Sequence, residues 1–378
     1  MNAKIDVGVL GATGMVGERL VRLLQDHPWF RLAEVGASER SAGTRLGKLV
    51  RPGEEGPLLE EVAELPVRSL EGRWHSPLLL SALPSDVARE LEPRLASEGH
   101  LVVSNASSHR MGADVPLVMP EINASHLSLL ESQAERWRGG LVTNPNCAVT
   151  GLAMALAPLH RTFGVESVVV TTFQSISGAG RPGPAAGDLL DNVLPFIAES
   201  EEEKIASEPR KILGRVEGGR VIAADFPVSA TATRVPVTHG HLVSVSVTLA
   251  RAASPAEAAE AMRSFRGEVA GDQLPSAPAL PLEVLDEPDR PQPRLDRDRG
   301  KGMTVTVGRI RRCEVGHLKF FALAHNLVRG AAGAALLNAE ICHLRGLTTR
   351  DGEPAPAPTA QADGSPQESL SAPGGRAR

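Results

Sequence analysis

The sequence predicts an α/β protein with two domains, and three observations support this fold class. The chain has 378 residues, more than one hydrophobic core usually serves, so we expect two domains. Short apolar runs alternate with helical patterns in the first part of the chain, as in a parallel sheet covered by helices. A second group of strand patterns follows a helix near the middle of the chain, which indicates another sheet.

A glycine-rich turn follows the first expected strand. The strand is Ile5–Leu10, and the turn is Gly11–Gly17, after which a helical pattern begins. Glycines here permit a tight turn, let backbone N–H groups approach a pyrophosphate and allow close helix packing. The alternative is a tight turn without a ligand, but the strand–turn–helix order favours a Rossmann-type doubly wound dinucleotide-binding domain. The candidate cofactor-binding residues of this turn are Gly11, Thr13, Gly14, Met15 and Val16.

The second expected strand, Leu32–Ala37, ends in a segment that bears on the choice of cofactor. An NAD enzyme usually places an acidic residue at this point to hold the ribose 2′-hydroxyl. Arg40 instead suits a 2′-phosphate, with Ser38 and Ser41 as hydrogen-bond donors. Two alternatives stay open, a solvated Arg40 and an NAD ribose held by Glu39. The sequence favours NADP.

Three further apolar runs extend the expected parallel sheet, at Leu78–Leu83, Leu101–Val103 and Leu141–Thr143. The loops at the carboxyl ends of such strands lie over the cofactor. The loop after the second run contains Arg110, a candidate anion clamp. An arginine in such a loop is more often only solvated, so this residue alone decides nothing.

An abrupt turn, Asn144-Pro145-Asn146-Cys147, joins the last of these strands to an alanine-rich helix expected over Ala148–Leu159. It places the Cys147 thiol at a helix N-terminus, where unpaired N–H groups and partial positive charge favour a thiolate. A thiolate is a nucleophile. The alternative is that Cys147 is a small buried hydrophobe, which is the usual state of a free cysteine.

The second half of the chain contains the elements expected for the second domain. Val165–Phe173 reads as a strand that opens a new sheet, and Leu242–Leu249 alternates apolar and polar residues like a half-buried strand. The remaining expected elements are a helix start at Glu199–Glu203, a helix at Pro255–Phe265, a proline-rich surface connection at Pro275–Pro293, strands at Met303–Ile310 and Lys319–Leu323, and a helix from Asn326 to about His343. Residues 349–378 are rich in Pro, Ala, Gly and Ser, which predicts disorder.

Several polar residues near strand ends are candidates for chemistry. Gln174 ends a strand before a glycine-rich turn and could hold a substrate carbonyl or the cysteine, although structural glutamines are commoner. His239 and His241 both suit a general base by their ordinary pKa, and spacing does not separate them. The acidic run before Lys204 is most simply a solvated helix start.

Composition excludes several classes of protein. The net charge of −5, only 3% aromatic residues and no tyrosine leave neither a basic footprint nor a stacking platform for nucleic acid. No apolar run approaches a membrane span or a signal peptide, so we expect a cytoplasmic protein. Cys147, Cys313 and Cys342 are too far apart for a disulfide framework or a zinc site. We expect no metal, and packed thiols at Cys313 and Cys342.

Together these motifs resemble the aspartate-semialdehyde dehydrogenase family, in particular its archaeal and fungal branch. The resemblance covers about residues 4–346, and the order and spacing of its motifs are highly specific. His325 before Asn326, where many bacterial members carry Asp, agrees with that branch. The motifs are Gly11–Gly17, Ser38–Gly43, Pro120–Asn123, Asn144–Cys147, Gln174–Gly180, Glu201–Lys204, Arg234 with His241, and Asn326–Gly333.

The resemblance implies a role for each candidate residue. Cys147 would attack the aldehyde or acyl phosphate, Gln174 would orient the intermediate, and His241 would act as acid and base. Arg234 would hold the substrate carboxylate and Glu201 its amino group, although three consecutive glutamates leave that register open. The other implied contacts are phosphate for Arg110, Lys204 and Asn105, and nicotinamide for Asn326.

The implied reaction is NADPH-dependent reduction of L-4-aspartyl phosphate to L-aspartate 4-semialdehyde through a thioacyl enzyme, on the route to lysine, methionine and threonine. The implied architecture is a Rossmann-type NADP domain over residues 1–143, completed by a C-terminal helix at 326–346, and an α+β catalytic and dimerisation domain over 144–325. A homodimer or homotetramer is expected.

Alternative functions remain. An acyl-CoA reductase of the same branch, such as malonyl-CoA reductase, would keep Cys147 and His241 and use a thioester. N-acetyl-glutamyl-phosphate reductase is more distant, because Glu201 and Arg234 suit a free amino acid better than an acylated one. A catalytically silent homologue acting as a binding protein is a third alternative, although Cys147 and its partners are intact.

Overall fold

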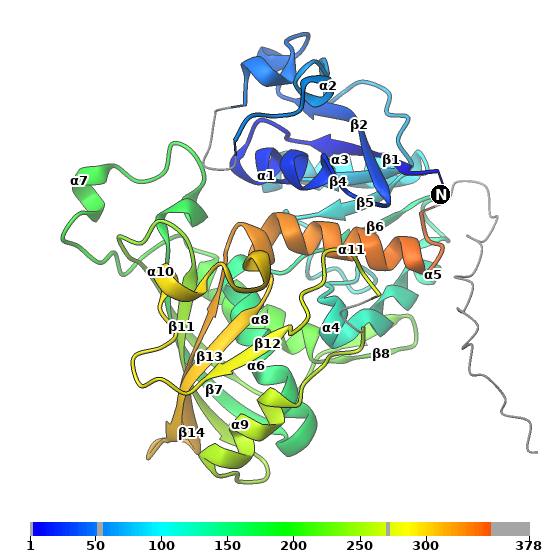
Figure 1. The fold of residues 1–378 in the computed structure, drawn as a ribbon. Helices are drawn as coiled ribbons and strands as arrows, with labels where there is room; N and C mark the ends of the chain where they lie inside the picture. Colours follow the sequence, from blue (N-terminus) through cyan, green and yellow to red (C-terminus); the bar gives the residue numbers. More distant parts are fainter. Residues whose placement is uncertain (1–2, 51–55, 270–272, 349–378) are drawn as a thin grey trace, which may run out of the picture.

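A computed structural model describes residues 3–50, 56–269 and 273–348 of the chain. The described residues form two six-stranded sheets and one two-stranded sheet. In Figure 1 the first large sheet lies above the second, with α11 (Gly333–Leu344) running between them. The α/β fold expected from the sequence is confirmed.

The first sheet has the order β3-β2-β1-β4-β5-β6, and all of its strand pairs are parallel. The order reverses between β1 and β4, which is the switch point where doubly wound sheets bind ligands. Its strands are β1 (Ile5–Leu10), β2 (Phe30–Ala37), β3 (Val67–Ser69), β4 (Leu78–Ser81), β5 (Leu101–Ser104) and β6 (Gly140–Thr143).

Helices cover both faces of this sheet, because side chains alternate along each strand. Leu78 and Leu80 pack in one core with α1 (Met15–Leu24) and α11, whereas Leu79 packs in another with α3 (Ser85–Ser97). The shorter helices that follow its strands are α2 (Glu60–Ala63), α4 (Pro120–Asn123) and α5 (Leu129–Gln133). Buried on both faces, the sheet is a rigid base for the loops at its carboxyl edge.

The second sheet is mixed, with the order β10-β7-β11-β14-β13-β12. One face carries Val168, Val170 and Val245 into a core built with α6 (Cys147–Phe163), α8 (Glu201–Ile212) and α9 (Pro255–Arg263). Val169, which lies between Val168 and Val170 on β7, points to the other face and is 54% exposed. The strands are β7 (Val165–Gln174), β10 (Val228–Arg234), β11 (His241–Leu249), β12 (Leu282–Leu285), β13 (Val305–Arg312) and β14 (Leu318–Ala324). The other elements are α7 (Ala186–Leu189), α8 (Glu201–Ile212), α9 (Pro255–Arg263), α10 (Pro293–Asp296) and the hairpin β8 (Arg215–Glu217) and β9 (Arg220–Ile222).

Helix α6 joins the two sheets. It begins directly after the turn that follows β6 and packs along the second sheet, in contact with β11, β14, β13 and β7. Most of its side chains are buried, which explains the run of small and apolar residues that predicted it. Asn146 caps the helix by accepting a hydrogen bond from the N–H of Ala148 at 2.8 Å. Cys147 is therefore the first residue of a helix that begins directly after the first sheet and packs on the second.

Some elements differ from those expected. The proline-rich segment 275–293 contains β12, an edge strand paired in parallel with β13, so it is more than a connection. The short strand β3 and the strand β10, which ends at Arg234, were not among the expected strands, although β10 alternates small apolar and polar residues. The helix expected from Asn326 begins as a π-helical turn at Val328–Ala332 and continues as α11. The predicted disordered tail, residues 349–378, lies outside the described residues.

Candidate active site

The thiol of Cys147 and the imidazole of His241 meet at the point where the two sheets face each other. The Sγ–Nε2 distance is 3.2 Å, and His241 is the first residue of β11. His239, the other histidine that spacing left open, is bound instead to Ser177 Oγ through Nδ1 at 2.9 Å. The geometry therefore selects His241 as the partner of the cysteine.

Ser175 fixes the orientation of the imidazole. Its backbone N–H donates to His241 Nδ1 at 3.0 Å, and its Oγ lies 3.1 Å from the same nitrogen. Because a backbone N–H only donates, Nδ1 accepts, and the proton of the neutral ring is on Nε2, directed at the sulfur. The Ser175 hydroxyl can accept from Nδ1–H when the ring is protonated. The Ser175 backbone N–H thus fits only an unprotonated Nδ1, whereas its hydroxyl can also accept from Nδ1–H.

Asn326 holds the segments that surround this pair. Its Oδ1 accepts from Ser175 Oγ at 3.1 Å and from the N–H of Gly240 at 2.9 Å, and its Nδ2 donates to Ser177 Oγ at 2.9 Å. One N–H of the Asn326 amide has no partner in these contacts. It is the part of the side chain that could meet a ligand.

Arg234 lies on the other side of His241. Its Nη1 donates to the Ser175 carbonyl at 2.8 Å, and a Cβ placed on Gly178 would lie 2.9 Å from both Arg234 Nη1 and His241 Nε2. A side chain at position 178 would therefore fill the space between the arginine and the imidazole. Glycine there leaves room for a small anionic ligand beside the reacting pair.

Gln174 and Glu201 form a hydrogen-bonded pair next to the cysteine turn. Gln174 Nε2 and Asn146 Nδ2 each donate to Glu201 Oε1 at 3.0 Å, and Lys204 Nζ lies 3.5 Å from Glu201 Oε2. Glu202, the neighbour of Glu201, accepts from the N–H of Ala232 instead. The geometry thus separates the consecutive glutamates and directs Glu201 into the site.

Arg110 is buried on the opposite side of the cysteine turn. Its Nη1 donates to Glu208 Oε1 at 2.9 Å and its Nη2 to the Asn105 carbonyl at 2.6 Å, whereas its buried Nε has no partner among the described residues. The Asn105 side chain is also bound, because its Oδ1 accepts from Asn144 at 2.9 Å. An unpaired guanidinium N–H in a buried site is a donor for an anion.

The electrostatics of the site oppose the thiolate that a helix N-terminus favours. Burial, followed by the charge of Glu201, raises the pKa of the Cys147 thiol, and Arg110 and Arg234 only partly oppose this. Burial also lowers the pKa of His241, and the charge of Arg234 adds to that shift. The helix N-terminus alone therefore does not produce a thiolate. Cys147 and His241 both rest neutral, and the thiol must lose its proton when it reacts.

The glycine turn after β1 has the geometry that a dinucleotide needs. Gly11 has φ +79°, and a Cβ on Gly17 would lie 2.0 Å from the Gly11 carbonyl oxygen. Helix α1 begins without a side-chain cap at Gly14, so the N–H groups of its first turn face outward. These features fit a pyrophosphate. Arg181 donates to both carboxylate oxygens of Glu18 in this turn at 2.7 and 2.9 Å, which joins the turn to the loop after β7.

The segment after β2 favours a phosphorylated ribose. Ser69 Oγ donates to the carboxylate of Glu39, which engages the acidic residue that an NAD ribose would need. Arg40 is exposed beside it, and Ser38 and Ser41 flank the pair on a short 3₁₀ turn, Glu39–Ser41. The guanidinium of Arg40 is thus accessible to a 2′-phosphate.

The structure brings most of the expected residues together and adds others. Sequence reasoning did not assign Ser175, Ser177, Glu208 or Lys211, all of which contact predicted site residues. The spacing Glu201, Lys204, Glu208, Lys211 on one face of a helix was a signal that could have indicated the last two. Among the described residues no group of three His, Cys, Asp or Glu side chains could hold a metal ion, and no helix is long and apolar enough to span a membrane.

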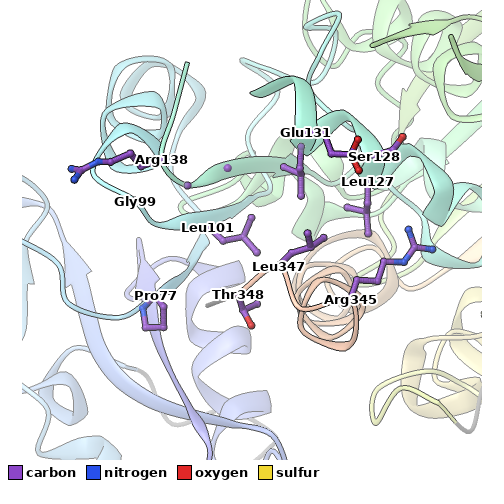
Figure 2. Close-up of a pocket in the computed structure, with 13 residues that line it drawn as sticks. Pro77, Gly99, Leu101, Leu127, Ser128, Glu131, Arg138, Arg345, Leu347 and Thr348 are labelled. Carbon is purple, nitrogen blue, oxygen red and sulfur yellow. The ribbon is translucent and has the colours of Figure 1, made fainter. Parts of the chain in front are cut away.

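A separate cavity of about 440 Å³ lies at the opposite edge of the first sheet. Its lining includes Leu101 and Gly140, the first residues of β5 and β6, with Arg345 and Leu347 beyond α11 (Figure 2). Parallel sheets bind their ligands at the carboxyl ends of the strands. This cavity is at the amino ends and contains none of the site residues described above.

Two family models match the chain. The semialdehyde dehydrogenase NAD-binding domain matches residues 6–130, and the semialdehyde dehydrogenase dimerisation domain matches residues 156–329. The chain thus carries a dinucleotide-binding domain and a dimerisation domain, as the resemblance implied.

Known proteins resemble the chain over nearly its whole length. Aspartate-semialdehyde dehydrogenase of Archaeoglobus fulgidus is 46% identical over 343 residues, 89% of this chain and 98% of that protein. The Aspergillus fumigatus enzyme of the same name is 43% identical over 353 residues, 90% of this chain and 97% of that protein. Malonyl CoA reductase (NADP) of Metallosphaera sedula is 36% identical over 349 residues, 90% of this chain and 97% of that protein.

A solved structure agrees with these relatives. Aspartate-semialdehyde dehydrogenase of Candida albicans, solved with NADP, superposes with a TM-score of 0.82 at 36% identity, covering 90% of this chain and 99% of that chain. The family follows from the two matching domains, from relatives well above 30% identity and from this superposition. The chain belongs to the aspartate-semialdehyde dehydrogenase family, in the branch that contains the archaeal and fungal enzymes.

Proposed function

We propose that the protein catalyses the NADPH-dependent reduction of L-4-aspartyl phosphate to L-aspartate 4-semialdehyde, with release of phosphate. The observation that carries this proposal is the Cys147–His241 contact at 3.2 Å, with Arg234 near the imidazole and Arg110 on the other side of the cysteine turn. A nucleophile between two cationic groups suits a substrate with a carboxylate at one end and a phosphate at the other. The named relatives support the same substrate.

Each substrate group has a partner in the site. Arg234 would hold the α-carboxylate in the space beside Gly178, and Glu201 would accept the ammonium group, with its Oε2 directed toward Lys204. Arg110, Lys204 and Asn105 would face the phosphate. The Asn105 side chain would contribute least, because its amide already bonds Asn144 and the Ser81 carbonyl.

The chemistry begins at the sulfur. Cys147 Sγ attacks the acyl carbon, the bond to phosphate breaks, and the thiol proton leaves on the phosphate; His241 can relay it once its own ring proton has moved from Nε2 to Nδ1, which frees Nε2 to accept. Ser175 Oγ lies 3.1 Å from Nδ1 and can accept the ring proton there. Gln174 would orient the thioacyl carbonyl formed on Cys147.

NADPH, when bound, supplies the hydride that reduces the thioacyl group. Gly11, Thr13, Gly14, Met15 and Val16 would hold its pyrophosphate, Ser38, Arg40 and Ser41 its 2′-phosphate, and Asn326 its nicotinamide. The C–S bond then breaks to release the aldehyde, and the sulfur regains one proton, through His241, for each turnover. That proton is needed because the resting thiol is neutral.

Reduction of a CoA thioester is the second candidate, favoured by the similarity to malonyl CoA reductase of Metallosphaera sedula. Malonyl-CoA has a free carboxylate for Arg234 but no ammonium group. Glu201 Oε1 already accepts from Gln174 and Asn146, whereas Oε2 has Lys204 at 3.5 Å, so the ammonium of an amino-acid substrate would add a second cationic partner that malonyl-CoA lacks. Glu201 therefore favours the aminated substrate.

A substrate panel with purified protein separates the two. We expect phosphate-dependent reduction of NADP with L-aspartate semialdehyde and no oxidation of NADPH with malonyl-CoA. Turnover with malonyl-CoA and none with the semialdehyde would refute the first proposal. The same assay with NAD in place of NADP tests the cofactor preference, which we expect to be for NADP.

We further propose a cytoplasmic homodimer or homotetramer, divided into an NADP domain of residues 1–143 with 326–346 and a catalytic domain of 144–325. This division keeps each six-stranded sheet in one domain. Leu190, Val193 and Phe196 near α7 are exposed, and Phe196 is 67% exposed, which suits an interface between copies. Sedimentation at several concentrations would show a monomer if the assembly is wrong, and cell fractionation tests the compartment.

A further inference from the structure

One face of α8 contributes two buried charged residues that the proposed chemistry does not use. Glu201 and Lys204 face the substrate space, and Glu208 and Lys211 follow them on the same helix. Glu208 is 1% exposed and Lys211 is 4% exposed. Buried charges at this depth need strong partners, because desolvation is otherwise costly. Their partners show what these residues do.

Glu208 connects the anion-binding arginine to the nucleophile turn. One carboxylate oxygen accepts from Arg110 Nη1 at 2.9 Å, and the other accepts from the backbone N–H of Asn146 at 2.6 Å. Asn146 is the residue before Cys147 and the cap of α6. A single carboxylate therefore sets the guanidinium and the turn that carries the sulfur in one fixed relation.

Lys211 holds the loop that carries Arg110. Its Nζ donates to the backbone carbonyls of Arg110, Gly112 and Val115 at 2.6, 2.6 and 2.7 Å. Three acceptors in this arrangement match the three N–H groups of an ammonium. Glu208 and Lys211 thus both fasten the loop after β5 to helix α8.

We propose that Glu208 is a positioning residue that fixes the Arg110 guanidinium relative to Cys147, so that the phosphate and the nucleophile are held in one geometry, with Lys211 fixing the Arg110 loop. This rests on the proposed function, in which Arg110 binds phosphate. It also gives a test of sign. If Glu208 were only a counter-charge to Arg110, it would weaken anion binding, and its removal would lower the KM for phosphate. If Glu208 positions Arg110, its removal will raise the KM for phosphate.

The test measures steady-state constants for Glu208→Gln in the direction that consumes phosphate. We expect the KM for phosphate to rise about tenfold or more, because a misplaced charge-assisted donor loses about 1.4 kcal/mol or more. The KM for NADP should change less than about twofold. Glu208→Asp keeps the charge but is one methylene shorter, so it cannot span both partners and should raise the phosphate KM as well. An unchanged or lowered KM in both variants would overturn the proposal.

A double-mutant cycle and a matched control remove a purely structural explanation. In an Arg110→Met background, Glu208→Gln should change the phosphate KM less than about twofold, because its effect passes through the arginine. Full additivity would contradict the proposal. Glu34→Gln is the control: Glu34 also accepts from an arginine, Arg68, and from backbone N–H groups, but lies on β2. It should lower the melting temperature without moving the phosphate KM.

A readout without turnover separates this proposal from the proposed function. Cys147 is treated with iodoacetamide at alkaline pH, because its raised pKa makes the reactive thiolate scarce near neutral pH. Inorganic phosphate should protect it, and mass spectrometry of the Cys147 peptide distinguishes it from Cys313. Glu208→Gln should raise the half-protecting phosphate concentration about tenfold. If the wild type shows this protection but does not turn over the semialdehyde, the positioning role stands and the substrate assignment fails. If phosphate protects both proteins equally, the positioning role fails.

Discussion

The two halves of the candidate active site are built in different ways. On the acyl-transfer side, His241 and Arg234 are buried side chains fixed by hydrogen bonds to the backbone of Ser175, and Gln174 is fixed by a hydrogen bond to Glu201. On the cofactor side, the expected contacts are backbone N–H groups of the Gly11–Gly17 turn and exposed side chains such as Arg40. Chemistry requires groups that are already in place, whereas a dinucleotide that leaves after each turnover can be held by an open surface.

The largest expected effect is a loss of turnover when the acyl-transfer side alone is changed. Cys147→Ala removes the nucleophile, so turnover should fall by at least about 10³-fold. Dinucleotide affinity measured by calorimetry should stay within about twofold, because the cofactor contacts lie in other segments. Residual activity near that of the wild type would rule out Cys147 as nucleophile. Cys313→Ala is the matched control, since Cys313 is also a free, partly exposed cysteine and contacts Ser246.

The complementary substitution changes the cofactor side alone and should affect the KM for NADP. Arg40→Ala should raise the KM for NADP about tenfold or more, through loss of a charge-assisted bond to the 2′-phosphate, and leave the KM for NAD unchanged. The kcat with saturating NADP should stay close to that of the wild type. Arg45→Ala is the control, because Arg45 is another exposed arginine in the same region but pairs with Glu64. A wild-type preference for NAD, or equal effects on both cofactors, would remove Arg40 from the 2′-phosphate site.

The same difference explains what the sequence could predict. The cofactor turn is a local pattern of strand, glycines and helix, so its residues were identified without knowledge of distant segments. The Ser175–His241–Asn326 network joins residues up to 151 positions apart, and no local pattern encodes those pairings. The local turn pointed to Cys147 and the family resemblance chose His241 over His239, but neither indicated Ser175 or Glu208, because these act through other residues. The influences on the thiol pKa are distant for a related reason, since burial and the charge of Glu201, which raise it, come from segments far from Cys147 in the sequence.

The smallest expected effect concerns the protonation of His325, at the junction where the acyl-transfer side meets the cofactor side. His325, next to Asn326, stacks on His239 with ring centroids 5.5 Å apart, and burial lowers its pKa to about 3, aided by the charges of Arg19, His239 and Arg297. An unfolded histidine binds a proton below about pH 6.5. Between that pH and about 3 the unfolded chain binds one more proton at this position than the native chain does, so acid destabilises the fold.

His325→Gln should remove that contribution. The free energy of unfolding, measured with urea at several pH values, should fall less steeply on acidification, by about 1.4 kcal/mol per pH unit between pH 6 and 4. His75→Gln is the control, because His75 is exposed on the first domain and its removal should leave the slope unchanged. An equal slope in the wild type and His325→Gln would mean that His325 is protonated in the native protein. The junction would then be an open surface like the cofactor side, and Asn326 would belong to that side rather than to the buried network around His241.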